Sequence, residues 1–275
     1  MVGSRYSWMF EVESYNASHS FSSSGGGSGG SYIFATDKGG NQGGEGSESA
    51  GEWWIEGMRE DLDAENEYWF DETAQELHFY YNGTGPPPSE AVVPKLANLI
   101  ELQGAQAYPV RNVSLVGLTF TANRPTFMEP RGNPSGGDWS LERMGAVMLE
   151  GVEHTLVAGC TFTKLDSNAL FLSGYSRHAV ITNNSFSWLG QNAIASWGKS
   201  NFNDGTNGDQ PRGTVVSGNW ATEVGVIQKQ SSMYFQAETA QATIVDNVCF
   251  NIPRAAVNFN VRRRAAALAV LSAIL

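Results

Sequence analysis

The sequence predicts an all-β protein built as a parallel β-solenoid, and three observations support this prediction. Two consecutive stretches of about two dozen residues, 154–174 and 178–198, follow the same pattern of apolar, Asn and Gly residues. Their apolar residues form short β-type runs between Asn and Gly turns, without a helical period. The chain also has 31 glycines and only 16% charged residues, which is typical of a turn-rich β protein.

The repeats align in columns that a solenoid would stack. Apolar columns are expected to point inward, and a column of mostly Asn is expected at a tight turn, where amides of successive coils bond to one another. The inward columns hold Leu115, Val157, Ile181, Val216 and Ile244, then Phe120, Phe162, Phe186, Ala221 and Cys249, then Leu165, Leu189, Val224 and Ile252, and finally Leu170, Ile194 and Val257. The turn column holds Leu118, Cys160, Asn184, Asn219 and Asn247.

Four regions follow from these patterns. Residues 1–52 contain Gly/Ser-rich tracts that cannot repay the entropy of ordering, so we expect a flexible segment with one short strand at 32–34. Residues 53–104 hold an aromatic hairpin and lead-in strands, and residues 105–260 form the solenoid. Residues 261–275 abandon the repeat for an Arg, Ala and Leu tail.

The N-terminal hairpin is predicted from two alternating runs, 67–71 and 76–81, joined by the polar turn 72–75. Two more short strands are expected at 91–94 and 99–102. The hairpin aromatics could stack on sugars, but we favour their use as a cap over the open end of the solenoid. These aromatics are Trp54, Tyr68, Trp69, Phe79 and Tyr81.

Composition excludes several classes of partner. The formal net charge of −11 argues against nucleic acid and anionic membranes, which need a positive protein face. The apolar run 265–275 is too short to span a bilayer, and no secretory signal opens the chain. Cys160 and Cys249 fall in different columns, so no disulfide is expected. His154 and His178 repeat without a third ligand nearby, and we expect a monomer without metal or cofactor.

Eight short motifs in the chain carry a resemblance to a known superfamily. They are Glu67–Asp71, Pro134–Trp139, Leu165–Asp166, Gly174–Tyr175, Asp204–Thr206, Lys229–Ser232, Pro253–Arg254 and Asn258–Asn260. These motifs resemble the right-handed parallel β-helix, or pectin-lyase-like, superfamily. The similarity covers residues 53–260 and is strongest to uncharacterised right-handed β-helix domain proteins, which are distantly similar to β-helix glycoside hydrolases. It implies a carbohydrate-active, extracellular or cell-surface protein. Such relatives continue past Asn260 with further coils, so the resemblance also implies a truncated chain.

The inward columns fix which residues face outward. Asp166 and Glu223 should lie two coils apart, roughly 10 Å, because strands are about 4.8 Å apart, which is near the upper end of the carboxylate separation of inverting glycosidases. We expect them to act as acid and base, with Trp188 and Trp197 as stacking surfaces. Lys164 is expected to bind substrate and could also lower a neighbouring carboxyl pKa. The alternative is that Asp166 bonds its own turn and Glu223 is a solvated charge.

Other candidate site residues come from a polar run and two insertions. Lys229 could serve as the base of a polysaccharide lyase, and Gln230 and Arg254 could bind substrate. Insertions 121–144 and 199–212 break the repeat spacing. Because insertions of a solenoid tend to collect on one face, and that face often binds ligand, they point to a site.

Three functions remain open on the sequence. The first is a glycoside hydrolase-like enzyme acting on a polysaccharide. The second is a non-catalytic glycan-binding domain or surface scaffold. The third is a polysaccharide lyase. In each case the expected partner is a polysaccharide or other glycan.

Overall fold

The protein is described here by a computed structural model, which places residues 9–16, 31–39, 55–134, 140–200, 204–260 and 270–273. Within these ranges every regular element is a β-strand, apart from one turn of 3-10 helix, η1 (Arg59–Asp61). The predicted all-β class is therefore confirmed. The same ranges contain no helix with the length and apolar character needed to cross a bilayer.

Two parallel sheets and two antiparallel strand pairs make up the fold. The first parallel sheet contains β7 (Ser114–Val116), β8 (Thr119–Phe120), β10 (Leu156–Ala158), β11 (Thr161–Leu165), β13 (Val180–Thr182), β14 (Ser185–Leu189), β17 (Val215–Ser217), β18 (Trp220–Val224), β20 (Thr243–Phe250) and β22 (Val270–Ala273). The second contains β5 (Ile100–Gln103), β6 (Val110–Arg111), β9 (Val147–Glu153), β12 (Leu170–Arg177), β15 (Ile194–Trp197), β16 (Pro211–Arg212), β19 (Ser232–Ala237) and β21 (Ala255–Asn260). The antiparallel pairs are β1 (Phe10–Asn16) with β2 (Ser31–Gly39) and β3 (Tyr68–Asp71) with β4 (Glu76–Phe79).

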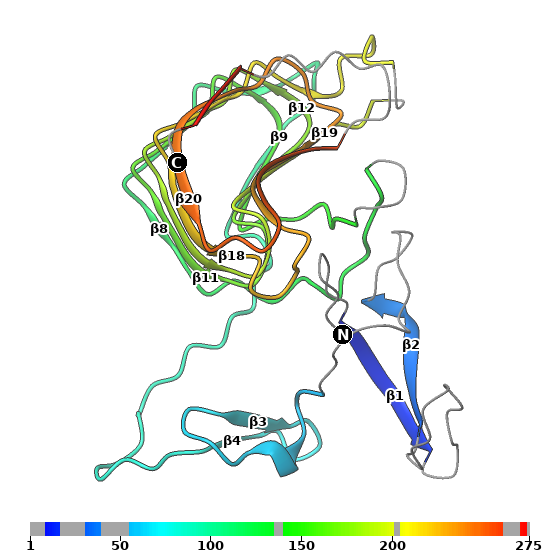
Figure 1. The fold of residues 1–275 in the computed structure, drawn as a ribbon, viewed down its shortest axis with the longest axis vertical. Helices are drawn as coiled ribbons and strands as arrows, with labels where there is room; N and C mark the ends of the chain where they lie inside the picture. Colours follow the sequence, from blue (N-terminus) through cyan, green and yellow to red (C-terminus); the bar gives the residue numbers. More distant parts are fainter. Residues whose placement is uncertain are drawn as a thin grey trace.

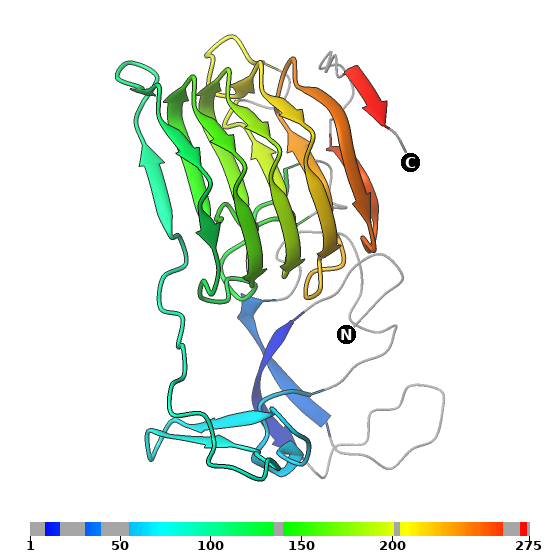
Figure 2. The ribbon, with the colours of Figure 1, turned by 90° about the vertical axis from the view of Figure 1, so that its left-hand side faces the viewer.

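Successive passes of the chain stack in parallel. Val157 pairs with Leu115 before it and Ile181 after it, and Ile181 pairs in turn with Val216. Each pass thus returns to the same place one strand spacing further along, as Figure 2 shows for the strands running side by side. Figure 1, viewed along the stack, shows the first sheet curling around the side opposite β9, β12 and β19. The predicted alignment of the repeats is confirmed.

The inward columns form one continuous core. Val157, Ile181 and their stacked equivalents are buried, as predicted. The rings of Phe120, Phe162 and Phe186 stack with centroids 4.8 Å apart at each step. This spacing matches the distance between hydrogen-bonded strands, about 4.8 Å, because each ring is carried by the next strand of the sheet.

The predicted Asn column forms a buried ladder. Asn184 Nδ2 donates to Asn219 Oδ1 at 3.0 Å, and Asn219 Nδ2 donates to Asn247 Oδ1 at 2.9 Å. The same two oxygens also accept the backbone N–H groups of Asn184 and Asn219. The ladder therefore satisfies backbone groups at a turn that the sheets leave unpaired.

A second ladder, not predicted from the sequence, lies at the turn into the second sheet. Asn192 Nδ2 donates to Asn168 Oδ1 at 2.8 Å, and Asn168 Nδ2 donates to the carbonyl of Met144 at 2.9 Å. The Ser232 N–H donates to Asn192 Oδ1 at 2.8 Å. These hydrogen bonds fix the turn and, with it, the outward residues on either side.

The N-terminal region matches its prediction only in part. The hairpin is confirmed as β3 and β4, and the expected strand at 32–34 lies within β2. β2 pairs with β1, which the composition did not predict. Residues 91–94 are not a strand, and Val92 and Val93 are 81% and 69% exposed.

The capping role predicted for the hairpin aromatics is not seen. Tyr68 is 70% exposed and Phe79 is 39% exposed, and Figure 2 shows β3 and β4 apart from the first coil. The ring of Phe79 stacks instead on Tyr81, and Trp69 contacts His78. Trp54 lies outside the described residues, as do most of residues 1–52 and of the C-terminal tail.

Removing one rung of the Asn ladder should destabilise the whole stack. We expect Asn219→Ala to lower the free energy of unfolding by about 2–4 kcal/mol, because it leaves buried backbone groups unpaired. Thr182→Ala in the preceding coil is the control, since it removes only an outward hydroxyl bonded to Ser217, and should cost less than about 1 kcal/mol. Urea unfolding followed by circular dichroism measures both, and equal losses would contradict this role of the ladder.

Candidate functional site

The two insertions lie against the outward side of the second sheet, as expected if they mark a site. Figure 1 shows both on the side of β9, β12 and β19. From the 121–144 insertion, Leu141 is buried among the outward side chains of Phe171, Ala195 and Phe235. This face of the sheet is therefore built partly from residues of the insertion.

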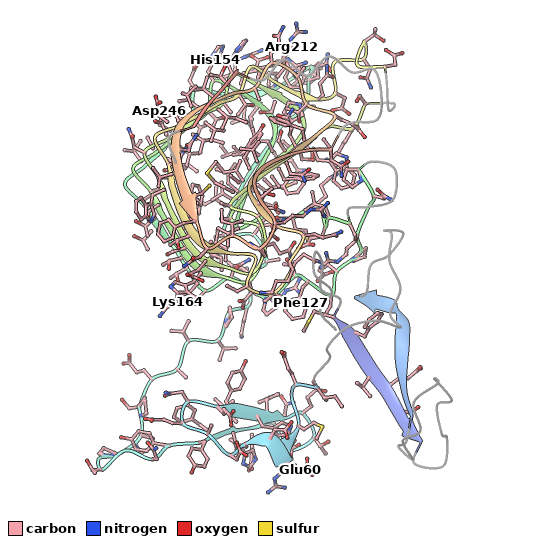
Figure 3. The ribbon with its side chains drawn as sticks, viewed as in Figure 1. Glu60, Phe127, His154, Lys164, Arg212 and Asp246 are labelled. Carbon is pink, nitrogen blue, oxygen red and sulfur yellow. The ribbon has the colours of Figure 1, made fainter. Side chains whose placement is uncertain are left out.

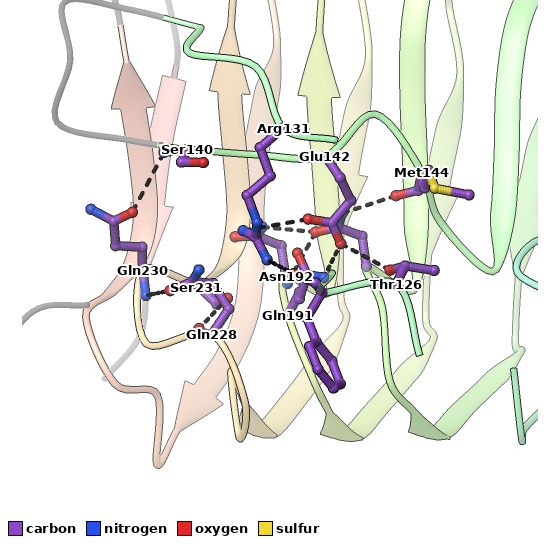
Figure 4. Close-up of polar contacts among 12 residues, drawn as sticks. Thr126, Arg131, Ser140, Glu142, Met144, Gln191, Asn192, Gln228, Gln230 and Ser231 are labelled. Carbon is purple, nitrogen blue, oxygen red and sulfur yellow. Dashed lines mark hydrogen bonds and ion pairs between the residues drawn. The ribbon is translucent and has the colours of Figure 1, made fainter. Parts of the chain in front are cut away.

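A buried ion pair anchors the 121–144 insertion (Figure 4). Glu142 Oε2 lies 3.5 Å from Arg131 Nη1, and both side chains are almost fully buried. Glu142 Oε1 accepts hydrogen bonds from Thr126 Oγ1 at 2.9 Å and from Gln191 Nε2. Burial raises the pKa of the Glu142 carboxyl, against the opposing effects of Arg131 and Thr126. Since Gln191 belongs to the turn between β14 and β15, the pair ties the insertion to the stack.

The polar run around Lys229 helps hold the same segment. Gln230 is buried, and its Oε1 accepts the backbone N–H of Ser140 at 3.5 Å. Ser231 Oγ donates to the carbonyl of Gln228 at 2.6 Å. Figure 4 shows these residues beside Glu142 and Arg131. Gln230, predicted to bind substrate, thus lies beneath the insertion, and its substrate-binding role is still a hypothesis.

Arg143, the residue after Glu142, reaches over the outer face in another direction. Its guanidinium carbon lies 3.9 Å from the Trp197 ring centroid and 6.0 Å from that of Phe171. It donates to Ser173 Oγ at 3.0 Å and to the carbonyls of Trp197 and Gly198 at 2.6 and 2.9 Å. The guanidinium is therefore fixed in position over the sheet.

Three carboxylates act on Arg143. Burial lowers the pKa of its guanidinium to about 10, and the charges of Glu150, Glu238 and Asp209 oppose this shift. Lys199 Nζ donates to Glu150 Oε1 at 2.5 Å. We call Arg143, Glu150, Trp197, Lys199 and Glu238 the outer-face cluster.

The pKa values of the two glutamates in the outer-face cluster are displaced in opposite directions. Burial alone would raise the pKa of Glu150, but hydrogen bonds from Lys199 and Ser173 outweigh it and lower the value. Burial raises the pKa of Glu238, despite hydrogen bonds from Trp197 and Ser200. Two carboxyl groups with such different proton affinities are suited to the roles of base and acid.

The strand register places Glu150 and Glu238 on different coils. Glu150 pairs with Ser173, Ser173 with Trp197, and Trp197 with Ala237, the residue before Glu238. The backbones of the two glutamates are thus three strand spacings apart, roughly 14 Å. The charges of both carboxylates act on the Arg143 guanidinium.

The column containing Trp188 faces outward, as predicted. Lys164, Trp188, Glu223 and Asn251 all have a positive φ, between 49° and 54°, so they occupy one repeated left-handed turn. Trp188 is 56% exposed, and Asn251 Nδ2 donates to Glu223 Oε1 at 2.8 Å. Figure 3 shows Lys164 at the corner between the two sheets, away from Phe127 of the insertion.

Asp166 follows this corner into the second sheet. Its carboxyl group is half-buried, and burial raises its pKa. Its N–H donates to Asn123 Oδ1 at 2.9 Å. In the next coil Gly190 packs so closely that an added Cβ would lie 2.6 Å from the Asp166 carbonyl oxygen. Asp166 and Glu223 keep their predicted positions, and their catalytic roles are still a hypothesis.

Lys229 and Arg254 lie elsewhere on the stack. Lys229 Nζ donates to the carbonyls of Gly225 and Val226 at 3.2 and 2.8 Å, and burial lowers its pKa. Arg254 is half-buried immediately before β21. Trp197 is the only residue of the sequence-derived set that belongs to the outer-face cluster; the roles predicted for Lys229 and Arg254 are also still hypotheses.

The sequence signal for the outer-face cluster was weak but present. Glu150 occupies an outward position of β9, and Glu238 directly follows β19. The second insertion lengthens the segment between β15 and β19. Ile194 therefore pairs with Tyr234 and not with a residue two dozen positions later. This shift hid the alignment of Trp197 with Ala237. Among the described residues, no group of three or more His, Cys, Asp or Glu side chains is placed to hold a metal ion.

Comparisons with known proteins add a structural similarity. No family model matches the chain, and no curated protein matches it. A solved structure described as "Glycoside hydrolase" superposes with a TM-score of 0.57 at 16% sequence identity. The match covers 70% of this chain and 40% of that chain, so it supports a shared fold over less than half of the larger protein.

The buried ion pair generates a test of the anchor. We expect Glu142→Gln to lower the free energy of unfolding by about 3 kcal/mol, because it removes the buried carboxylate opposite Arg131. Glu129→Gln is the control in the same insertion. Its partner Arg124 is 2.8 Å away but well exposed, and the loss should be under about 1 kcal/mol. Similar losses in thermal or urea unfolding would show that the buried pair is no special anchor.

Proposed function

We propose that this protein is a carbohydrate-active right-handed parallel β-helix that acts on a polysaccharide in the manner of a glycoside hydrolase. Three findings support the proposal: the stacked parallel coils, the structural similarity to a glycoside hydrolase, and the outer-face cluster. Right-handedness follows from the strong preference of crossover connections between parallel strands. A polysaccharide partner and an extracellular or cell-surface location are consistent with this activity.

The observation that carries the proposal is the pair Glu150 and Glu238 around Arg143. The pair lies where the two insertions meet the outer face, and the environment of each carboxyl favours a different protonation state. Glycoside hydrolysis needs two such carboxyl groups on either side of the scissile bond.

The reaction assigns one role to each glutamate. Protonated Glu238 donates its proton to the glycosidic oxygen as the bond from that oxygen to the anomeric carbon breaks. Ionised Glu150 accepts a proton from water, whose oxygen forms the new bond to the same carbon. Water attack on the opposite face inverts the anomeric centre. Lys199 keeps Glu150 ionised through its hydrogen bond.

Trp197 has a positioning role in this proposal. Its ring lies under Arg143 and packs so closely on the insertion that an added Cβ at Gly132 would lie 2.4 Å from it. A sugar therefore does not stack on this ring while Arg143 is in place. Trp197 instead holds Arg143 and donates a hydrogen bond to Glu238.

A second candidate site uses the turn column and the residues first identified in the sequence. Its support is the exposed ring of Trp188, which lies between Lys164 and Glu223 in successive coils. Asp166, with its raised pKa, would then be the acid and Glu223 the base. A glycan-binding scaffold without catalysis would use the same ring, and a lyase would use Lys229 as its base.

Substitution of both acidic pairs distinguishes these sites. We expect Glu150→Gln and Glu238→Gln each to lower kcat/KM for glycan cleavage by at least about 100-fold, the scale of general acid–base catalysis. Asp166→Asn and Glu223→Gln should leave it within about threefold of wild type, a change of less than about 0.7 kcal/mol. Reducing-sugar release from a polysaccharide panel measures this, with absorbance of unsaturated products as the lyase readout. The opposite pattern would move the site to the turn column.

The pH dependence follows from the two displaced pKa values. Activity should rise with pH as Glu150 ionises, below the ordinary glutamate pKa of about 4.3, and fall as Glu238 loses its proton above that value. The expected profile of kcat/KM is therefore a bell, with its lower limb set by Glu150 and its upper limb set by Glu238. An activity that keeps rising into alkaline pH would contradict Glu238 as the acid.

A further inference from the structure

Uncharged side chains occupy alternate outward positions of β11, β14, β18 and β20, beside the turn column that carries Lys164 and Glu223. These side chains alternate with the second inward column, which holds Phe162, Phe186, Ala221 and Cys249, and so point away from the core. They are Thr161, Thr163, Ser185, Ser187, Trp220, Thr222, Val248 and Phe250. We call these eight residues the hydroxyl–aromatic face. All eight are uncharged in a chain whose net charge is −11.

The aromatic part of this face is exposed and ordered. Trp220 and Phe250 are 47% and 43% exposed. Their ring centroids are 5.1 Å apart, with the planes at 83° to each other. The rings come from neighbouring strands, because Trp220 pairs with Val248 and Thr222 with Phe250. Two large rings that hold each other in place form a rigid platform at low entropic cost to a ligand.

Hydroxyl groups line the face beside the rings. Ser187 Oγ donates to Thr163 Oγ1 at 3.0 Å across neighbouring strands. Ser185 pairs with Trp220, and Ser187 pairs with Thr222. Each hydroxyl can donate one hydrogen bond and accept others, so the row offers both kinds of partner to a chain laid across the strands.

We propose that the hydroxyl–aromatic face is a binding surface for a neutral polysaccharide, separate from the outer-face cluster. A pyranose presents C–H groups that pack on aromatic rings and hydroxyls that need both donors and acceptors. None of the eight side chains is a cation, and the negative net charge of the chain would repel a polyanionic glycan. The proposal rests on the proposed function for its ligand class, and it narrows that class to uncharged glycans.

The position of the face suits a role beside catalysis. It belongs to the first sheet, whereas the outer-face cluster lies on the second. Figure 1 shows β11 and β18 on the side of the stack away from the insertions next to β12 and β19. A polysaccharide held on this face would keep the protein on its substrate without occupying the cluster.

The test is polysaccharide binding by the full chain. Sedimentation with microcrystalline cellulose, insoluble xylan and insoluble mannan, and affinity electrophoresis with polygalacturonate and alginate, cover neutral and acidic probes. We expect binding to a neutral probe and at least tenfold weaker binding for Trp220→Ala and for Ser187→Glu, which introduces a charge. Tyr108→Ala, which removes a side chain 85% exposed elsewhere, should bind as wild type. Circular dichroism confirms that each variant is folded.

The outcomes separate this inference from the proposed function. Glu238→Gln should bind the neutral probe as tightly as wild type while losing hydrolysis. If Trp220→Ala binds unchanged, if no neutral probe is bound, or if acidic probes bind better, the inference is overturned whatever the hydrolysis assay shows. If Trp220→Ala loses binding but wild type cleaves no glycan, the binding surface stands and the proposed hydrolase activity fails.

Discussion

Parallel backbone pairing between successive coils is the constraint on which the rest of the structure depends. It fixes each residue relative to its equivalent one strand away, so a single inward residue determines the direction of its neighbours over the whole stack. The Asn184 and Asn192 ladders satisfy the turns that this pairing leaves open. The core, the outward columns and the positions of both candidate sites follow from that register.

The outer-face cluster combines this register with a segment that does not share it. Residues Glu142 and Arg143 are neighbours in the chain, yet one enters a buried ion pair and the other lies over Trp197. The buried pair gives the insertion a fixed anchor, and the anchor places the guanidinium among the carboxylates of the coils. Stability of the fold and geometry of the site are thus joined at two consecutive residues.

The sequence predicted the features that recur from coil to coil and missed those that lie in or next to the insertions. The inward columns, the Asn184 ladder and the outward position of Trp188 recur at a regular interval, so pattern alone located them. Glu142 could not be located, because a buried charge in an insertion has no periodic signal and depends on Arg131 from the same irregular segment. Glu238 was missed because the second insertion displaces β19 from the regular interval. The hairpin aromatics were read as a cap from composition, although capping depends on where the hairpin docks.

The proposed hydrolysis requires a glycan to bind at the outer-face cluster between Glu150 and Glu238. A crystal structure of the Glu238→Gln variant soaked with an oligosaccharide that the wild-type protein cleaves would test this binding. We expect sugar density beside the Glu150 carboxylate and within reach of Arg143 and Lys199. Density over Trp188 and Asp166, with the outer-face cluster empty, would contradict it.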